Sequence, residues 1–152
     1  MSNYRTNKAA IDKFRAELKA MLGDISEIDS RILTQAVNEG LADAKRNTPV
    51  GQYPPGSGRV GGFMRKSWAV TPTKKTASGV EKSLINTAEY ASFVNYGHRQ
   101  EVGRYVPAIG KRLVRPWVKG KFILEKAVSK VEKQLVEEFR KEVERVNRKH
   151  DK

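Results

Sequence analysis

Hydrophobic residues recur every three or four positions near the start of the chain, which is the spacing of helices that bury one face. A first stripe consists of Ile11, Phe14, Leu18 and Met21. We expect Gly23 to end this helix, so that a separate N-terminal helix covers residues 1–23. The second stripe consists of Ile28, Ile32, Ala36, Gly40 and Ala44. Ser26 and Asp29 resemble a capping box at its start, and Pro49 ends the helix near Asn47.

The same spacing is sustained furthest at the C-terminal end of the chain. Apolar residues alternate there with charged ones, at Leu124, Val128, Val131, Leu135, Phe139, Val143 and Val146. This pattern predicts a helix over residues 121–147, about 37 Å long, with fraying beyond it. A single amphipathic helix covering the protein's own sheet is the favoured interpretation, and a seam with another helix is the alternative.

The middle of the chain predicts short strands and one short helix. Residues 64–71 alternate between apolar and polar, residues 74–79 form a polar turn and residues 80–87 return, which together indicate a hairpin. Apolar residues spaced as one helical turn follow at Tyr90, Phe93 and Val94, and Gly97 is the expected C-terminal cap. Residues 113–118 predict an edge strand, because Pro116 cannot donate a ladder hydrogen bond.

Residues 51–62 predict a long flexible loop. They contain five glycines and two prolines, with no apolar period to bury. We expect this loop to be mobile in the isolated protein, since long irregular segments within compact domains are typically functional or disordered.

Composition narrows the class of protein. A chain of 152 residues favours one domain, and 38% hydrophobic against 31% charged residues favours a thin or partner-dependent fold. The absence of cysteine excludes disulfides, thiol catalysis and cysteine-bound zinc. With no apolar run of membrane-spanning length and no signal-peptide pattern, we expect a soluble protein made in the cytosol.

The net charge of +13 is concentrated in the middle of the chain, where residues 49–121 hold 13 basic and three acidic side chains. A surface of this kind favours an acidic partner, either nucleic acid or an electronegative protein face, and a simple solubility surface is the alternative. The candidate partner-binding residues are Arg65, Lys66, Arg99, Arg104, Lys111, Arg112 and Arg115.

The sequence contains patterns typical of nucleotide and metal sites, but the neighbouring residues do not support such sites. Residues 56–61 match G-x-G-x-x-G, but prolines precede them and a strand pattern follows, so the helix that would hold a dinucleotide pyrophosphate is missing. His98 has only Glu101 nearby as a second metal ligand, and no serine-nucleophile elbow occurs. We therefore expect no enzyme, no cofactor and no small-molecule substrate.

Trp68 and Trp117 each allow two interpretations. Beside basic residues either indole could stack on a nucleic-acid base. A core position is favoured for both, and the alternation of Trp68 with Val70 supports it for that residue.

An ordered set of short motifs carries a family resemblance. Thr48-Pro49-Val50-Gly51 is followed by Met64-Arg65-Lys66-Ser67-Trp68 and then by Glu89-Tyr90-Ala-Ser-Phe-Val-Asn-Tyr-Gly97-His98-Arg99. This order resembles the gene-product-ten-like minor tail components, a family of small neck proteins of tailed phages and prophages. The resemblance covers residues 25–145, and its motif residues are Pro49, Trp68, Tyr90, Gly97 and His98. Residues 52–61 are an insertion relative to the family pattern, so no family role is carried over to them.

The resemblance implies an α+β fold, with a small antiparallel sheet flanked by N-terminal helices, a long C-terminal helix and long loops. It also implies a virion protein that completes the tail and joins it to the head connector, in a ring of six copies around the DNA channel. The implied partners are copies of itself, the connector, and tail-terminator or tail-tube proteins, with transient DNA contact and no membrane. The loop residues expected to order on assembly are Gly51, Tyr53, Gly58, Arg59 and Gly62. The rival interpretation is a basic nucleic-acid-binding module.

Overall fold

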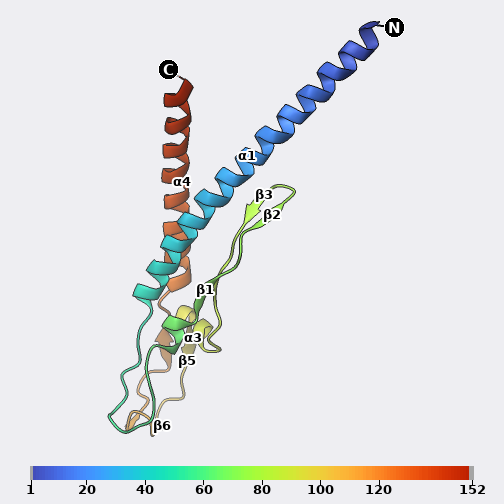
Figure 1. The fold of residues 1–152 in the computed structure, drawn as a ribbon. Helices are drawn as coiled ribbons and strands as arrows, with labels where there is room; N and C mark the ends of the chain where they lie inside the picture. Colours follow the sequence, from blue (N-terminus) through green and yellow to red (C-terminus); the bar gives the residue numbers. More distant parts are fainter. Residues whose placement is uncertain (1, 151–152) are drawn as a thin grey trace.

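The computed structural model describes residues 2–150 and is built on two long antiparallel helices (Figure 1). Helix α1 spans Ser2–Asn47 and helix α4 spans Ile123–His150. At 1.5 Å per residue these helices are roughly 69 and 42 Å long, so α1 extends well beyond the C-terminal end of α4. Residues 151 and 152 of the tail that we expected to fray lie outside the described residues.

Helix α1 is continuous, so the expectation that Gly23 ends a first helix is wrong. A glycine inside a helix costs only about 1 kcal/mol relative to alanine, which neighbouring turns readily offset. The apolar spacing of three and four also runs on without a break through Met21, Ile25 and Ile28. The two stripes seen in the sequence therefore belong to one helix.

The helix pair packs closely near its lower end. Ala36, Val37 and Ala44 of α1 and Ala127 of α4 are buried, and Gly40 faces the side chain of Val131 and the carbonyl oxygen of Ala127 with no room for a Cβ. Two ion pairs cross between the helices, Arg31 with Glu142 at 3.0 Å and Lys130 with Asp43 at 3.4 Å. Small residues thus set the close approach of the helices, and partly exposed charges flank it.

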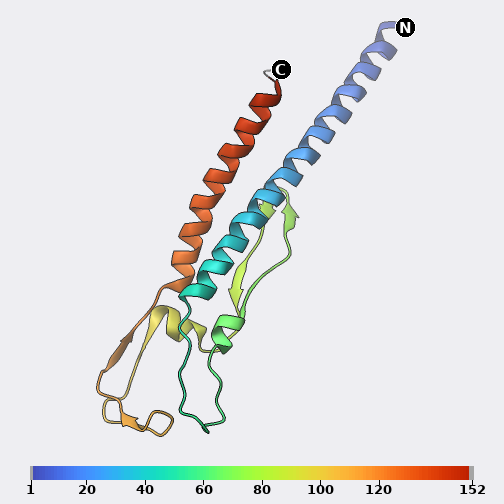
Figure 2. The same ribbon diagram turned by 60° about the vertical axis from the view of Figure 1, so that its left-hand side comes forward.

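The β structure consists of two-stranded antiparallel ladders rather than one broad sheet. Strand β1 (Trp68–Val70) pairs with β4 (Leu84–Asn86), with Trp68 opposite Asn86, and β2 (Lys74–Thr76) continues the same ribbon paired with β3 (Gly79–Glu81). This ribbon lies against α1 (Figure 2). Strand β5 (Gly97–Arg99) pairs with β8 (Trp117–Lys119), and β6 (Tyr105–Val106) pairs with β7 (Lys111–Arg112).

The predicted hairpin is present, with three corrections to its neighbourhood. Residues 63–66 form the short helix α2 (Phe63–Lys66), because Lys66 and Ser67 donate back to carbonyls one turn earlier. The expected polar turn over residues 74–79 contains strand β2, and the turn itself is confined to Ala77 and Ser78. The edge strand expected over residues 113–118 begins later, at Trp117, because Pro116 immediately precedes it.

The core lies where α1, α2, the ribbon and α4 meet. Its buried members are Ala44, Met64, Trp68, Ala88, Ile123 and Ala127. Trp68 is 5% exposed, which confirms its core assignment, whereas Trp117 is 49% exposed and its core assignment is wrong. Trp117 lies in β8, on a two-stranded arm with no second layer over it. The fold is α+β, as predicted, and none of the helices over residues 2–150 combines the length and apolar character needed to cross a membrane.

Candidate partner interface

Two long segments project from the lower end of the helix pair, away from both chain termini (Figures 1 and 2). One is the loop formed by residues 48–62, which follows α1. The other is the arm formed by residues 97–119, which contains β5, β6, β7 and β8. We call them the loop and the arm. Between them lie α2 and α3 (Ala91–Tyr96).

Buried hydrogen bonds fix the start of the loop. The Thr48 hydroxyl donates to the Ala44 carbonyl oxygen at 2.6 Å and accepts from Nε1 of Trp68 at 2.7 Å. Nη2 of Arg65 donates to the Thr48 carbonyl oxygen at 3.1 Å. Because Thr48 and Trp68 are buried, the bonds between them are shielded from competing water. The motif residues from Thr48 to Trp68 therefore fix the point where the chain leaves α1.

The loop itself is solvent-exposed over residues 49–60. At its neck the carbonyl oxygen of Gly51 occupies the space where a Cβ on Gly61 would lie, so the two sides of the loop touch there. Further out, the Arg59 guanidinium lies 6.0 Å from the centre of the Tyr53 ring, within the range of a cation–π contact. A cleft of about 580 Å³ separates the loop from α2 and α3.

An aromatic surface continues from this cleft across α2 and α3. Phe63, Tyr90, Phe93 and Tyr96 are all at least two-fifths exposed, and the ring centres of Phe63 and Tyr90 are 6.4 Å apart. Grouped exposed aromatic side chains are characteristic of surfaces that bind another protein.

The arm is attached to the start of α4 through Asn95, which is buried. Its Oδ1 accepts from the backbone N–H of Leu124 at 3.0 Å, and its Nδ2 donates to both carboxylate oxygens of Glu125, at 2.9 and 3.2 Å. Asn95 thus satisfies an N–H in the first turn of α4 that has no partner within the helix. Burial acts to raise the pKa of Glu125, but hydrogen bonds from Asn95, its own backbone and Tyr96 hold that pKa below its usual value.

Gly97 is the C-terminal cap of α3, as predicted, and its N–H donates to the Phe93 carbonyl. Its φ of 87° lies in the region that favours glycine. A Cβ at Gly97 would also collide with the Val118 carbonyl oxygen and with the nitrogen of Gly120. Gly97 therefore allows β5 to lie against β8 at the base of the arm.

The surface of the arm is both basic and apolar. It carries six basic side chains and one acidic side chain, Glu101. Apolar side chains are exposed between them, at Val102, Tyr105, Ile109, Val114 and Trp117. Arg112 is held in place, since its Nη1 donates to the Gly103 carbonyl at 2.8 Å and its guanidinium lies 6.0 Å from the Tyr105 ring centre.

The structure distributes the predicted partner-binding residues over two places. Arg65 and Lys66 lie on α2, and Arg99, Arg104, Lys111, Arg112 and Arg115 lie on the arm, all of them exposed. Of these, Arg65 has an internal role through its bond to Thr48. Sequence reasoning missed Thr48 and Asn95 as anchoring residues. The only signal for either was its place inside a motif, Thr48 before Pro49 and Asn95 before Gly97.

The geometry gives no support for a metal or nucleotide site in the described part of the chain. No group of three or more His, Cys, Asp or Glu residues converges there. His98 contacts the Phe93 ring edge-on, with ring centres 5.9 Å apart, and its Nδ1 is buried with no hydrogen-bond partner among the described residues. The G-x-G-x-x-G segment is an exposed part of the loop that leads into the four-residue helix α2.

An exposed aromatic and basic surface at one end of a slender α+β subunit is typical of a protein that works by assembly. Comparison with family models gives a match over residues 12–97, to the HK97-gp10-like family described as "Bacteriophage HK97-gp10, putative tail-component". The match covers more than half of the chain, which therefore belongs to this family. No curated protein and no solved structure matches the chain.

The matched segment begins within the first half of α1 and ends at Gly97. The segment before Gly23, which we expected to lie outside the family pattern, therefore falls partly within it. The family assignment identifies the protein as a phage tail component of the virion, which contacts other virion proteins.

Proposed function

We propose that this protein completes the tail and joins it to the head connector, as one subunit of a ring around the DNA channel. The observation that carries the proposal is the loop-and-arm end of the molecule, where exposed aromatic and basic side chains project from an anchored base. The family supports a tail component, and this surface supports a joining role for it. The function is assembly rather than catalysis.

The composition of the arm favours a protein partner over DNA. Arginine, tyrosine and tryptophan are enriched at the centres of protein interfaces, and the arm exposes all three among aliphatic side chains. A duplex-binding surface would instead need basic groups aimed at phosphates, with few exposed aliphatic residues between them. We propose that the arm docks on an acidic face of a neighbouring virion protein, with DNA as a secondary contact.

The test reverses two charges on the arm, Arg112→Glu together with Arg115→Glu. We expect particles made with this variant to contain filled heads and tails that fail to join, because the charges that orient docking are inverted. The control is Lys74→Glu with Lys75→Glu, the same change of charge on exposed strand β2 away from the arm. Joined, infectious particles from the arm variant, or from deletion of the gene, would contradict the proposal.

A further inference from the structure

The first half of α1 extends beyond the rest of the molecule. Arg31 pairs with Glu142 across the two antiparallel helices, and α4 continues eight residues further, to His150. Since both helices rise equally per residue, α4 reaches only to about residue 23 of α1. Residues 2–22 of α1 therefore lie past the end of α4, as Figure 1 shows.

Exposed apolar side chains lie on this projecting half and on the turn of α1 that follows it. Phe14 is 60% exposed, and Ile11 and Ile25 are about half exposed. Together with Leu18 and Met21 in the sequence, they step by three and four residues, which is the spacing of a helix that packs on a partner. Most of the stability of a helix in a protein comes from packing of its apolar face, so a stripe of this kind is stabilised by a cover.

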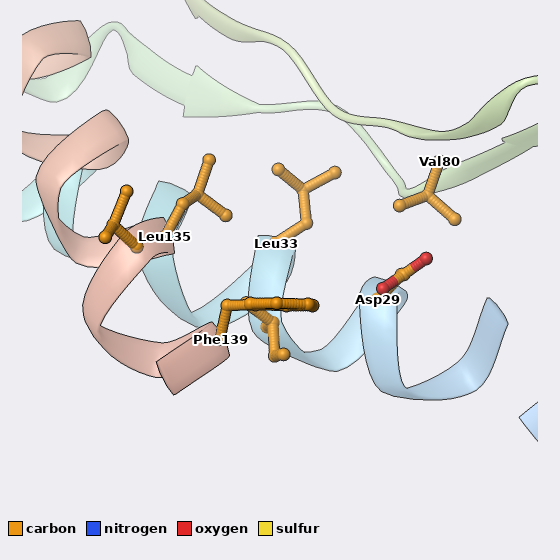
Figure 3. A pocket seen from close by; sticks show the side chains of 7 residues that line it. Asp29, Leu33, Val80, Leu135 and Phe139 are labelled. Atoms are coloured by element: carbon orange, nitrogen blue, oxygen red, sulfur yellow. The ribbon is translucent and has the colours of Figure 1, made fainter. Parts of the chain in front are cut away.

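An open apolar groove lies lower on the same molecule, between α1, β3 and α4 (Figure 3). It has a volume of about 400 Å³ and is lined by Asp29 and six apolar residues, Ile32, Leu33, Val80, Leu135, Val136 and Phe139. Phe139 is 58% exposed and Val136 is 60% exposed, with Val143 exposed one turn further along α4. These three residues are also spaced by three and four positions. The exposed side chains beside the groove therefore have the same helical spacing as those of the stripe, as in two helices that pack together.

We infer that the projecting half of α1 packs into the α1/β3/α4 groove of a second copy of this chain. The stripe cannot enter its own groove, because Phe14 and Ile32 lie on one continuous helix about 27 Å apart. The occupant must therefore be another molecule. The inference rests on the proposed ring of identical subunits and identifies the contact that joins them.

The charges around the two surfaces are complementary. Residues 5–19 carry five basic and two acidic side chains. Beside the groove, residues 24–29 of α1 carry three acidic side chains and none that is basic, and residues 132–144 of α4 carry five acidic and three basic. Opposite charges flanking an apolar helix seam select the partner and its orientation.

The stripe and the groove are different surfaces of the same subunit. Each subunit therefore contacts one neighbour through its stripe and another neighbour through its groove. Contacts of this head-to-tail kind form closed rings when the rotation between neighbours closes. A pairing of two stripes with each other would instead stop at a dimer.

Single cysteines test the contact cleanly, since the chain has none of its own. Full-length Ile11→Cys and Val136→Cys proteins are mixed and treated with a short thiol–thiol cross-linker. We expect a cross-linked product that joins one chain of each kind. Ala16→Cys, on the opposite side of α1, is the matched control and should give little product with Val136→Cys. Equal cross-linking of the control, or products joining only two Ile11→Cys chains, would overturn the inference.

A second experiment measures association of purified full-length protein by sedimentation. Phe14→Glu and Phe139→Glu should each weaken association about 10- to 100-fold, because a buried aromatic anchor is replaced by a charge. A mixture of the two variants retains one intact stripe and one intact groove, so it should form dimers and nothing larger. Circular dichroism checks that both variants keep their helical content. A wild-type protein that stays monomeric at every concentration and gives no cross-link would also overturn the inference.

These outcomes are separable from those of the proposed function. The arm variant, Arg112→Glu with Arg115→Glu, should associate normally and fail to join tails. If that variant joins tails normally while the cross-link forms as expected, the joining role fails and the subunit contact stands. If the cross-link is absent while the arm variant still blocks joining, the contact fails and the joining role stands.

Discussion

Gly97 is the residue on which the position of the arm depends most directly. It has a φ of 87°, and it lies against the backbone of β8 where a Cβ does not fit. Gly103 has nearly the same φ, 89°, but open space at the Cβ position. Both positions therefore have the positive φ that favours glycine, and only Gly97 adds a collision.

We predict that Gly97→Ala destabilises the protein clearly more than Gly103→Ala does. Backbone strain at a positive φ costs about 1–3 kcal/mol for a residue with a side chain, and the contact with Val118 and Gly120 adds to that cost only at Gly97. Urea unfolding of both variants measures the difference. Equal losses would mean that the backbone at the base of the arm shifts to accept the methyl group.

Asn95 and Glu125 provide a second test, through pH. The folded-state pKa of Glu125 lies below its usual value, so this carboxylate stabilises the fold above the unfolded-state pKa of about 4.3, and that stabilisation is lost as pH falls through the folded pKa. We predict that Asn95→Ala raises the pKa of Glu125, because the largest of the hydrogen bonds that lower it is removed. NMR titration of the Glu125 carboxyl carbon measures this pKa. An unchanged pKa of Glu125 in the variant would mean that the backbone hydrogen bond, and not Asn95, lowers this pKa.

At the scale of single residues, sequence patterns predicted part of the structure. The alternation of apolar and polar residues correctly predicted that Trp68 lies in the core. The core position that we favoured for Trp117 is wrong. A pattern of residues shows which face of a strand is apolar, but whether another layer covers that face is a tertiary property. The buried hydrogen bond from Trp68 to Thr48 could not be predicted from local sequence patterns either, since the two residues are 20 positions apart.

At the scale of elements, long periodic segments were the most predictable. The C-terminal helix was expected over residues 121–147 and spans Ile123–His150. Short segments fared worse, because the difference between a helical turn and a strand over residues 63–66 rests on only a few backbone hydrogen bonds. The prediction that Gly23 ends a helix was wrong for a related reason. The unfavourable helix propensity of one glycine is small compared with the stability of a helix that continues on both sides.

The loop is the element whose behaviour we expect to change on assembly. Its exposed glycines and prolines bury too little apolar surface to offset the entropy of ordering. We predict low hydrogen-exchange protection over residues 51–62 in the free subunit and higher protection in the assembled particle. Ala127, which is buried one turn into α4, serves as an internal reference that should be protected in both states. Equal protection of the loop in the two states would contradict the prediction.

The whole molecule is a slender rod with different surfaces along it. The helix pair carries nearly balanced charge, while the arm and its surroundings hold most of the excess positive charge. In the proposed ring, an arm that docks on protein needs to leave DNA free to pass, because each phosphate neutralised in the proposed channel would be a contact that transit must break. The strength of DNA binding therefore distinguishes the proposed joining role from the rival nucleic-acid-binding module.

We therefore predict weak binding of the isolated subunit to duplex DNA at physiological salt. If all six basic side chains of the arm contacted phosphates, the logarithm of the binding constant would fall with the logarithm of salt concentration with a slope of about −5. A subunit whose arm is shaped for protein should show a shallower slope and little binding near 0.15 M salt. Fluorescence anisotropy with a labelled duplex measures both quantities, and the variant with Arg112→Glu and Arg115→Glu reports how much of any binding comes from the arm. Tight binding with a slope near −5, abolished in that variant, would favour the nucleic-acid-binding module over a joining protein.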